Sequence, residues 1–117
     1  MSVLSRRRLE VEMVGDVTVV NFLDRRILDE QSVQAIGEQL FSLVDELGRK
    51  QLLLDFGNVE SLSGPVLGIM ARLNKKVKAA GGRLIACNLD PQIYELLKGL
   101  GGVVCQLKPP KPWWRFW

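Results

Sequence analysis

The pattern of apolar and polar positions predicts that the chain begins with a β-hairpin. Residues Leu9–Val14 alternate between apolar and polar side chains, which is typical of a strand with one solvated face. Residues Val17–Leu23 are rich in β-branched side chains, and only Gly15 and Asp16 separate the two segments. Because so short a connection joins antiparallel neighbours, we expect the two strands to pair as a hairpin.

A helix and a buried strand are predicted next, after a charged connection at residues 24–26. Asp29 is a suitable N-cap, and the apolar residues beyond it recur at steps of three and four, as in an amphipathic helix. Gly48 and the cations beside it are typical of a helix end. The run Leu52–Phe56 is apolar except for Asp55, as expected for an interior parallel strand. The predicted apolar stripe of the helix consists of Val33, Ile36, Leu40, Phe41, Val44 and Leu47.

The alternation of strand and helix continues through the second half of the chain. A second helix starts near Pro65, whose missing N–H is tolerated in a first turn, and stops at two adjacent glycines. The strand Arg83–Cys87 follows, and either Asn88 or Asp90 caps a third helix before the last strand, Val103–Leu107. The predicted inner faces are Val66, Leu67, Ile69, Met70, Leu73 and Val77, with Asn74 facing away, and then Ile93, Leu96, Leu97 and Leu100.

The predicted order is β-β-α-β-α-β-α-β, which defines an α/β fold. We expect a mixed β-sheet, with an N-terminal antiparallel hairpin and then parallel β-α units whose helices pack on the sheet. At 117 residues the chain is long enough for one domain with its own core. We predict a domain at residues 9–107, a basic lead at 1–8, and a Pro-rich, aromatic and cationic tail at 108–117.

The charge of the chain is distributed unevenly. The formal net charge is +3, but three arginines lie in the lead and three cations lie in the tail. Residues 9–107 contain ten basic and thirteen acidic residues, so the predicted domain is mildly acidic. A nucleic-acid interface needs clustered cations on the folded surface, so we expect no nucleic-acid partner.

The composition also argues against catalysis and against membrane insertion. The chain has no histidine, which removes the commonest general base and metal ligand, and two cysteines cannot close a structural zinc site. It has neither a phosphate-binding loop with a lysine nor a dinucleotide-binding glycine motif. No apolar run is long enough to span a membrane, and no secretory signal is evident. We therefore expect a cytoplasmic protein that is not an enzyme and holds no cofactor and no metal.

The most informative polar segment is the loop at residues 58–64, between a predicted buried strand and a helix. Ligand sites in open α/β sheets lie at the carboxyl ends of parallel strands, and a helix N-terminus favours anions. Ser61 and Ser63 supply hydroxyl groups at this place. Two interpretations remain open: an anion-binding loop, or an ordinary connection in which Ser63 caps the helix.

The tail combines a stiff segment with an aromatic cluster. Residues 108–112 contain three prolines and are expected to form an extended spacer. Aromatic rings beside cations suit a membrane interface or a hydrophobic groove, and a cluster this short gives only weak, reversible membrane contact. Folding of the tail onto its own domain and disorder are equally open. The aromatic residues are Trp113, Trp114, Phe116 and Trp117.

Several segments together resemble a known family. They are Leu53–Val59 at the central loop, Leu67-Gly68 in the second helix, Lys76–Leu84 before the fourth long strand, and Asn88–Tyr94 before the third helix. In this order they resemble the STAS domain (sulfate transporter and anti-sigma factor antagonist), of the stand-alone bacterial anti-sigma factor antagonist type. The resemblance covers the whole predicted domain.

The resemblance implies a function in transcription regulation and signal transduction. Such proteins bind an anti-sigma factor that is also a serine kinase, and binding releases a sigma factor. Phosphorylation of a serine in the central loop blocks that binding. In the family this loop usually reads Asp-Ser-Ser-Gly or Asp-Ser-Thr-Gly directly before a Leu-Gly pair, and the third of the four residues accepts the phosphate. Before Leu67-Gly68 of this chain, the four places hold Ser63, Gly64, Pro65 and Val66. Pro65 cannot accept a phosphate, so the resemblance implies a partner surface without the usual phosphoserine switch and leaves Ser63 as the candidate acceptor.

The partner-binding residues implied by the resemblance lie in two connections. Asp24 and Arg25 follow the second strand, and the topology of the family joins this connection to the central loop. Two alternatives from other classes are a small-ligand or anion sensor at the second helix and a membrane-associated scaffold attached by the tail. The expected partner-binding residues are Asp24, Arg25, Ser61, Leu62, Ser63, Gly64 and Pro65.

Overall fold

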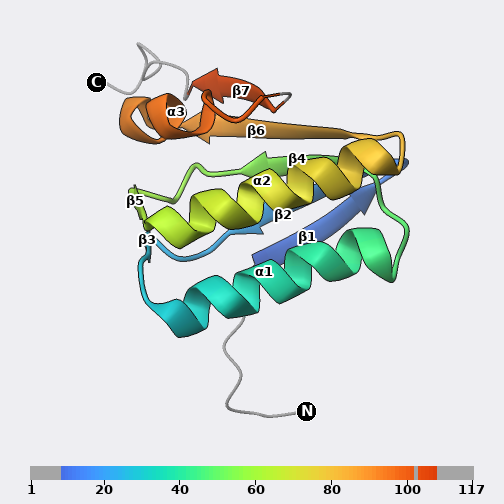
Figure 1. Cartoon of the computed structure of the whole chain (residues 1–117), viewed down its shortest axis with the longest axis horizontal. Coiled ribbons are helices and arrows are strands. Elements are labelled where there is room, and N and C mark those ends of the chain that lie inside the picture. The colour runs from blue at the N-terminus through green and yellow to red at the C-terminus, as the bar shows by residue number, and fades with distance from the viewer. Residues whose placement is uncertain (1–8, 102, 108–117) are drawn as a thin grey trace, which may run out of the picture.

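The computed structural model describes residues 9–101 and 103–107. The predicted lead and tail lie outside the described residues. The elements are β1 (Leu9–Val14), β2 (Val17–Phe22), β3 (Arg26–Ile27), α1 (Glu30–Asp45), β4 (Gln51–Asp55), β5 (Ser61–Leu62), α2 (Gly64–Ala79), β6 (Arg83–Leu89), α3 (Pro91–Leu97) and β7 (Val104–Leu107) (Figure 1).

The main sheet has five strands in the order β1-β2-β4-β6-β7. Strands β1 and β2 pair antiparallel across the turn at Gly15, whose φ of 60° suits glycine. The pairs β2–β4, β4–β6 and β6–β7 are all parallel. The predicted mixed α/β sheet, with an antiparallel hairpin followed by parallel units, is therefore confirmed.

Two short strands were not predicted. Strand β3 lies in the charged connection after β2, β5 lies inside the central loop, and the two pair parallel as a separate sheet. Arg26 faces Ser61, and Ile27 faces Leu62. A two-residue strand is too short to show an alternating pattern, so its pairing is set by the tertiary structure.

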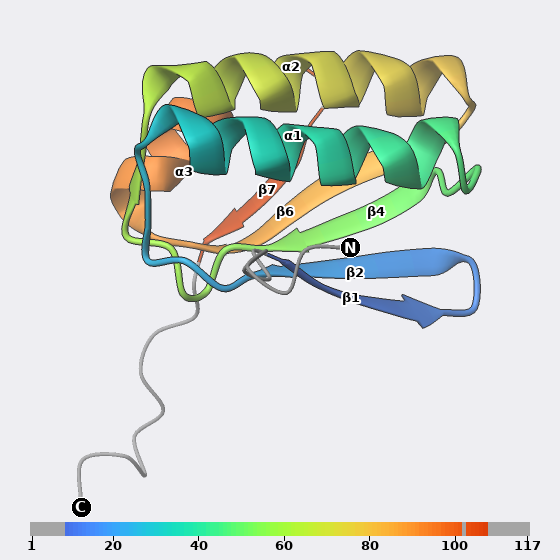
Figure 2. The same ribbon diagram turned by 90° about the horizontal axis from the view of Figure 1, so that it is seen from below.

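The three helices cover one face of the main sheet, and no helix of the described residues covers the other (Figure 2). Alternate strand residues point under the helices and are buried, including Val20, Leu54 and Ala86, which are paired across three strands. The helices α1 and α2 approach closely at Gly37, where an added Cβ would lie 3.0 Å from Cδ1 of Ile69. None of the described helices has both the length and the hydropathy needed to span a bilayer.

Three side chains differ in burial from the prediction. Leu47 is 57% exposed because α1 ends at Asp45, two residues before it. Leu96 is 45% exposed, since only one side of the short helix α3 meets the sheet. Asn74 is only 6% exposed, and its Nδ2 donates to the carbonyl of Gly101 over 2.7 Å, while its Oδ1 is buried without a hydrogen-bond partner among the described residues.

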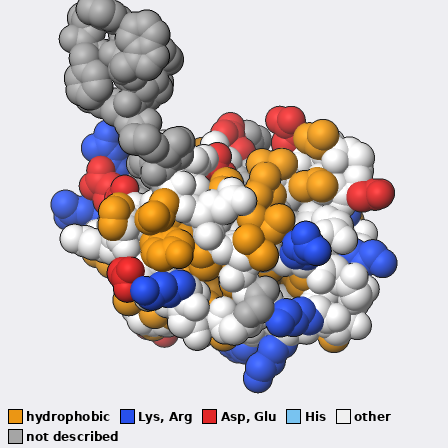
Figure 3. Space-filling view, turned by 90° about the horizontal axis from the view of Figure 1, so that it is seen from above, with side chains coloured by type: hydrophobic (Ala, Val, Ile, Leu, Met, Phe, Trp, Pro, Cys, Tyr) orange, Lys and Arg blue, Asp and Glu red, His pale blue; other side chains and the backbone are white. Residues whose placement is uncertain are grey.

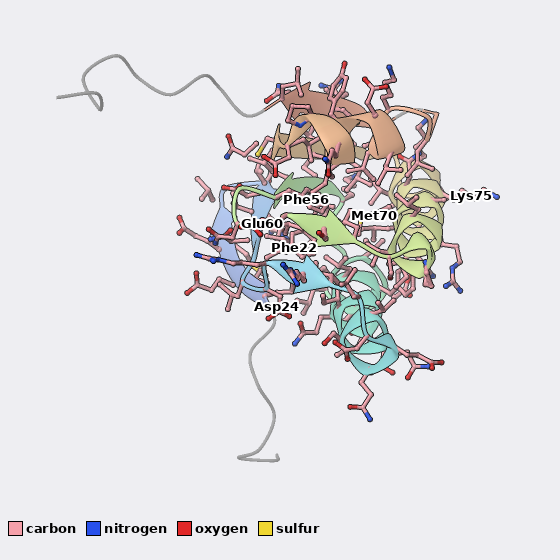
Figure 4. All side chains as sticks on the ribbon, turned by 90° about the vertical axis from the view of Figure 1, so that its left-hand side faces the viewer. Phe22, Asp24, Phe56, Glu60, Met70 and Lys75 are labelled. Carbon is pink, nitrogen blue, oxygen red and sulfur yellow. The ribbon has the colours of Figure 1, made fainter. Side chains whose placement is uncertain are left out.

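The start of the sheet is fastened by Arg49, which follows α1. Its Nε donates to Oγ1 of the buried Thr18 over 2.6 Å, and Nη2 donates to the carbonyl of Gly15 over 2.8 Å. Arg49→Ala is expected to lower the free energy of unfolding by about 1–2 kcal/mol, because the Thr18 hydroxyl loses its charged donor. Chemical denaturation checks this against Lys75→Ala, since Lys75 points into solvent (Figure 4). Equal losses in the two variants would contradict it.

Candidate functional site

The connection after β2 and the central loop meet at one end of the molecule. The N–H of Glu60 donates to the carbonyl of Arg25 over 2.7 Å, and the N–H of Ser63 donates to the carbonyl of Ile27 over 3.0 Å. Figure 4 faces this end and labels Asp24 and Glu60 on the two connections. Because backbone hydrogen bonds join them, the two connections form one continuous surface.

The base of the central loop is held by polar contacts from the ends of β4 and β6. One carboxylate oxygen of Asp55 accepts from the N–H of Gly57 over 2.8 Å and from Nδ2 of Asn88 over 3.0 Å. Asn88 has a φ of 57°, a conformation that Asn tolerates better than most residues, and Asp90 rather than Asn88 is the N-cap of α3. Asn58 extends the network by donating from Nδ2 to the carbonyl of Phe22 over 3.4 Å. The polar side chains of the loop base are thus used to hold the loop.

An aromatic pair lies beneath the loop. The rings of Phe22 and Phe56 stack with centroids 4.5 Å apart and an interplanar angle of 24°, and both side chains are fully buried. Val59 and Ile27 are also buried in this cluster, one from each connection. The surface above therefore rests on an apolar foundation that fixes both connections.

The start of α2 has an N-cap residue whose side chain does not cap the helix. Ser63 has extended backbone angles at the N-cap position, but its hydroxyl makes no capping hydrogen bond among the described residues. That Oγ is buried and has no hydrogen-bond partner in the described part of the chain. Gly64 and Pro65, the first residues of α2, are exposed. Ser63 therefore occupies the predicted N-cap position of α2, and only the expected capping by its side chain is wrong.

The N-caps of α1 and α2 provide a matched pair for a stability test. The carboxylate of Asp29 accepts from the N–H of Ser32 over 2.9 Å, so Asp29→Ala is expected to cost about 1 kcal/mol of unfolding free energy. Ser63→Ala is expected to leave stability unchanged or to raise it, since it removes an unsatisfied buried hydroxyl. Thermal and denaturant unfolding of both variants check this. A loss for Ser63→Ala as large as that for Asp29→Ala would contradict it.

A groove opens between the first turns of α1 and α2. Its volume is about 370 Å³, and its apolar lining includes Leu28, which is 51% exposed. Glu30 and Arg72, of opposite charge, belong to its polar part. The other lining residues are Val33, Gln34, Ser63, Pro65 and Ile69. An apolar centre with polar side chains around it is the usual composition of a protein-binding surface.

The expected partner-binding residues all lie at this end of the molecule. Asp24 is partly buried and Arg25 is exposed beside β3. Ser63 and Pro65 line the groove directly. The other three expected residues, Ser61, Leu62 and Gly64, belong to β5 and the first turn of α2. We name these seven residues together with the groove residues the loop surface.

Sequence reasoning missed part of the groove. Ile69 was predicted only as a core residue, and Arg72 had no predicted role, yet both line the groove. Leu28 had no assignment, although a leucine directly before a helix N-cap is a signal for a contact across the first turn. The groove forms because α1 packs beside α2. The local pattern of apolar and polar residues does not show which helices are neighbours.

The two thiols of the chain, Cys87 and Cys105, are free and partly buried. Burial raises the pKa of the Cys87 thiol, and the nearby Asp55 carboxylate raises it further. Burial also raises the pKa of the Cys105 thiol. A raised pKa reduces the thiolate that would react at neutral pH. Within the described ranges, no three His, Cys, Asp or Glu side chains are grouped so that they could hold a metal ion.

Fold and site together define a small α/β domain with a partly apolar groove at one end of the molecule. A family model described as the STAS domain matches residues 8–103. The chain belongs to the STAS domain family. No curated protein sequence matches it.

Solved structures support the same assignment at the level of the fold. An anti-sigma-factor antagonist (STAS) domain protein from Planctomyces limnophilus is 21% identical, with 91% of this chain and 93% of that chain covered and a TM-score of 0.73. The anti-sigma factor antagonist SpoIIAA in its unphosphorylated form is 17% identical, with coverages of 83% and 86% and a TM-score of 0.69. The Bacillus cell fate determinant SpoIIAA in its phosphorylated form is 17% identical, with coverages of 83% and 89% and a TM-score of 0.68.

Proposed function

We propose that this chain is a non-catalytic interaction domain of the anti-sigma factor antagonist type. It binds an anti-sigma factor of the serine kinase type through the loop surface and thereby controls release of a sigma factor. Two of the structural neighbours are described as anti-sigma factor antagonists, and they have the same fold over most of both chains. The observation that carries the proposal is the groove directly beside the joined connections β3 and β5.

The groove supports the proposal because it combines an apolar centre with fixed walls. Its volume of about 370 Å³ is enough for a large apolar side chain of a partner. Pro65 stiffens one wall and leaves no donor N–H at its position. Arg25 and Asp24 lie on the adjacent connection and supply charges for orientation.

We further propose that partner binding here is independent of a loop phosphoserine. Gly64, Pro65 and Val66 have no hydroxyl group, and the Ser63 hydroxyl is buried. A kinase could reach Ser63 only after the start of α2 had rearranged. Intact-mass and phosphopeptide measurements on protein isolated from the native host are expected to show no phosphate on the loop. A phosphate on Ser63 or Ser61 would contradict this.

The proposed partner is tested by co-purification from the native host with the full chain as bait. We expect recovery of a serine kinase of the histidine-kinase ATPase type, and binding that is reproduced with the two purified proteins. Recovery of other proteins only, or a kinase that does not bind when purified, would contradict the proposal.

The groove makes Leu28 the most informative position for that binding test. Leu28→Asp is expected to weaken partner binding by about 2 kcal/mol, about 30-fold in Kd, because a carboxylate then replaces an apolar contact. Leu47→Asp is the matched control, since Leu47 is 57% exposed at the opposite end of α1. Isothermal titration with the purified partner measures both. Equal Kd values for the two variants would show that the groove is not part of the interface.

The small-ligand sensor is the second candidate, and one observation favours it. The groove contains the buried Ser63 hydroxyl without a partner among the described residues, near the N-terminus of α2 and Arg72. An anionic ligand in the groove would meet Arg72 and the N-terminus of α2, and it would reach the Ser63 hydroxyl only after the start of α2 had rearranged. Thermal-shift measurements with nucleotides, inorganic phosphate and small carboxylates test this, and a shift abolished by Arg72→Ala would support the sensor over the partner-binding domain.

A further inference from the structure

The face of the sheet opposite the helices has a continuous apolar row. Val19 of β2 pairs with Leu53 of β4, Leu53 pairs with Ile85 of β6, and Ile85 pairs with Val104 of β7. These side chains are only partly buried, and Val104 is 43% exposed. No helix of the described residues lies over them (Figure 2). A row of this kind is a surface that another segment can cover.

One end of this face is acidic. A hollow of about 520 Å³ lies over β1, β2 and β4, and Glu10, Glu12 and Asp55 are among its lining residues. Glu12 pairs with Val19, so the apolar row leads directly into the hollow. Arg83 is at the opposite end of the strands, where it pairs with Gln51. The remaining lining residues of the hollow are Leu9, Val11, Val19 and Asn21.

We propose that residues 108–117 of the same chain cover this face, with the aromatic cluster over the acidic hollow. Strand β7 ends at Leu107, which pairs with Leu89 at the same end of the sheet as the hollow. From β7 to β2 there are three strand spacings, about 14 Å in total. Five extended residues, 108–112, span about 16 Å. A spacer of this length is therefore long enough to carry the aromatic cluster from the end of β7 to the hollow.

The chemistry of the two surfaces is complementary. The tail contains three cations, Lys108, Lys111 and Arg115, and the hollow contains three carboxylates. Indole rings have large apolar faces and a single polar N–H, so they suit an apolar row that ends among polar groups. Hydrophobic side chains also gather on the surface around α3 and β7 (Figure 3). Leu107 there is 50% exposed.

Tryptophan fluorescence tests the proposal directly, because all three tryptophans of the chain lie in the tail. We expect the emission of the folded full chain to be blue-shifted relative to the urea-unfolded chain, with weaker quenching by acrylamide. The double variant Glu10→Lys/Glu12→Lys is expected to move the emission of the folded protein back towards that of the unfolded chain. Glu38→Lys, a charge reversal on an exposed site of α1, is the control and should leave the emission unchanged.

A charge swap makes the test specific for this pairing. Lys111→Glu/Arg115→Glu alone is expected to lose the blue shift, and combining it with Glu10→Lys/Glu12→Lys is expected to restore the shift. No blue shift in the folded chain overturns the proposal. A shift that depends on protein concentration assigns the tail to a second copy and also overturns it. So does a shift seen only with phosphatidylcholine–phosphatidylglycerol vesicles, which assigns the tail to a lipid surface.

Discussion

Phe56→Ala is expected to lower the free energy of unfolding by about 3–5 kcal/mol. Phe56 is fully buried directly after β4, and its ring stacks on Phe22 at a centroid distance of 4.5 Å. Its N–H also donates to the carbonyl of Cys87 over 3.1 Å, so the backbone on which the ring stands is fixed. Little of the surrounding structure can collapse into the space that the ring leaves. Denaturation with guanidinium chloride measures the loss.

The aromatic pair makes this prediction specific. A double-mutant cycle with Phe22→Ala is expected to give a coupling energy of about 0.5–1.5 kcal/mol, because each ring loses its partner in either variant. Phe41→Ala is the control: Phe41 is only partly buried, beside the cations Arg72 and Lys76. A loss for Phe56→Ala no larger than the loss for Phe41→Ala would mean that the loop surface does not rest on the aromatic pair.

The same variant connects stability to the loop surface. Val59 and Ile27 pack in the core with Phe56, one from each connection that forms the surface. Amide hydrogen exchange at Glu60 and Ser63, whose N–H groups donate across the connections, is expected to speed up in Phe56→Ala. The loop surface is therefore held from below as well as along its edge.

The main sheet could be predicted because its pattern is local. Along Val17–Phe22, buried side chains that face the helices alternate with more exposed ones. Leu52 and Leu54 lie in a run that is apolar almost throughout. The turn at Gly15 and the helix end at Gly48 both need positive φ angles, which glycine adopts without strain. Each of these features depends on residues close together in the chain, so sequence alone predicts them.

The site could be predicted only in part because its geometry depends on distant residues. The joined strands β3 and β5 are 35 positions apart along the chain in the pair Arg26–Ser61, and two residues show no period. The groove depends on how α1 crosses α2 at Gly37. The unsatisfied hydroxyl of Ser63 contradicts local propensity, since serine at an N-cap position normally accepts from the helix backbone. Such departures from local preference occur most often at functional surfaces.

Gly82→Ala is the second large effect, and we expect a loss of about 3 kcal/mol in the free energy of unfolding. A Cβ at Gly82 would overlap the backbone carbonyl of Lys50, which is itself the acceptor for the N–H of Arg83 over 2.8 Å. The obstacle is backbone rather than a flexible side chain, so it cannot rotate away. Relief requires β4 and β6 to separate where they begin to pair.

Gly68→Ala is the matched control for this substitution. Gly68 lies inside α2, is exposed, and has no described atom within 4 Å of an added Cβ. Alanine there is expected to raise the free energy of unfolding by about 0.5–1 kcal/mol, because it favours the helix. Denaturation curves of the two variants should therefore shift in opposite directions. A shift in the same direction would contradict the predicted overlap at Gly82.

The consequence of Gly82→Ala should extend to the loop surface. The pairing of β4 with β6 starts at Gln51–Arg83 and ends at Asp55–Cys87, so a displacement at the start is carried along the ladder. The hydrogen bond from Asn88 to Asp55, which anchors the base of the central loop, is then lengthened or broken. We therefore expect Gly82→Ala to weaken partner binding although it lies at the far end of the strands, whereas Gly68→Ala should leave Kd unchanged. Titration with the purified partner, carried out at a temperature where both variants are folded, separates these outcomes.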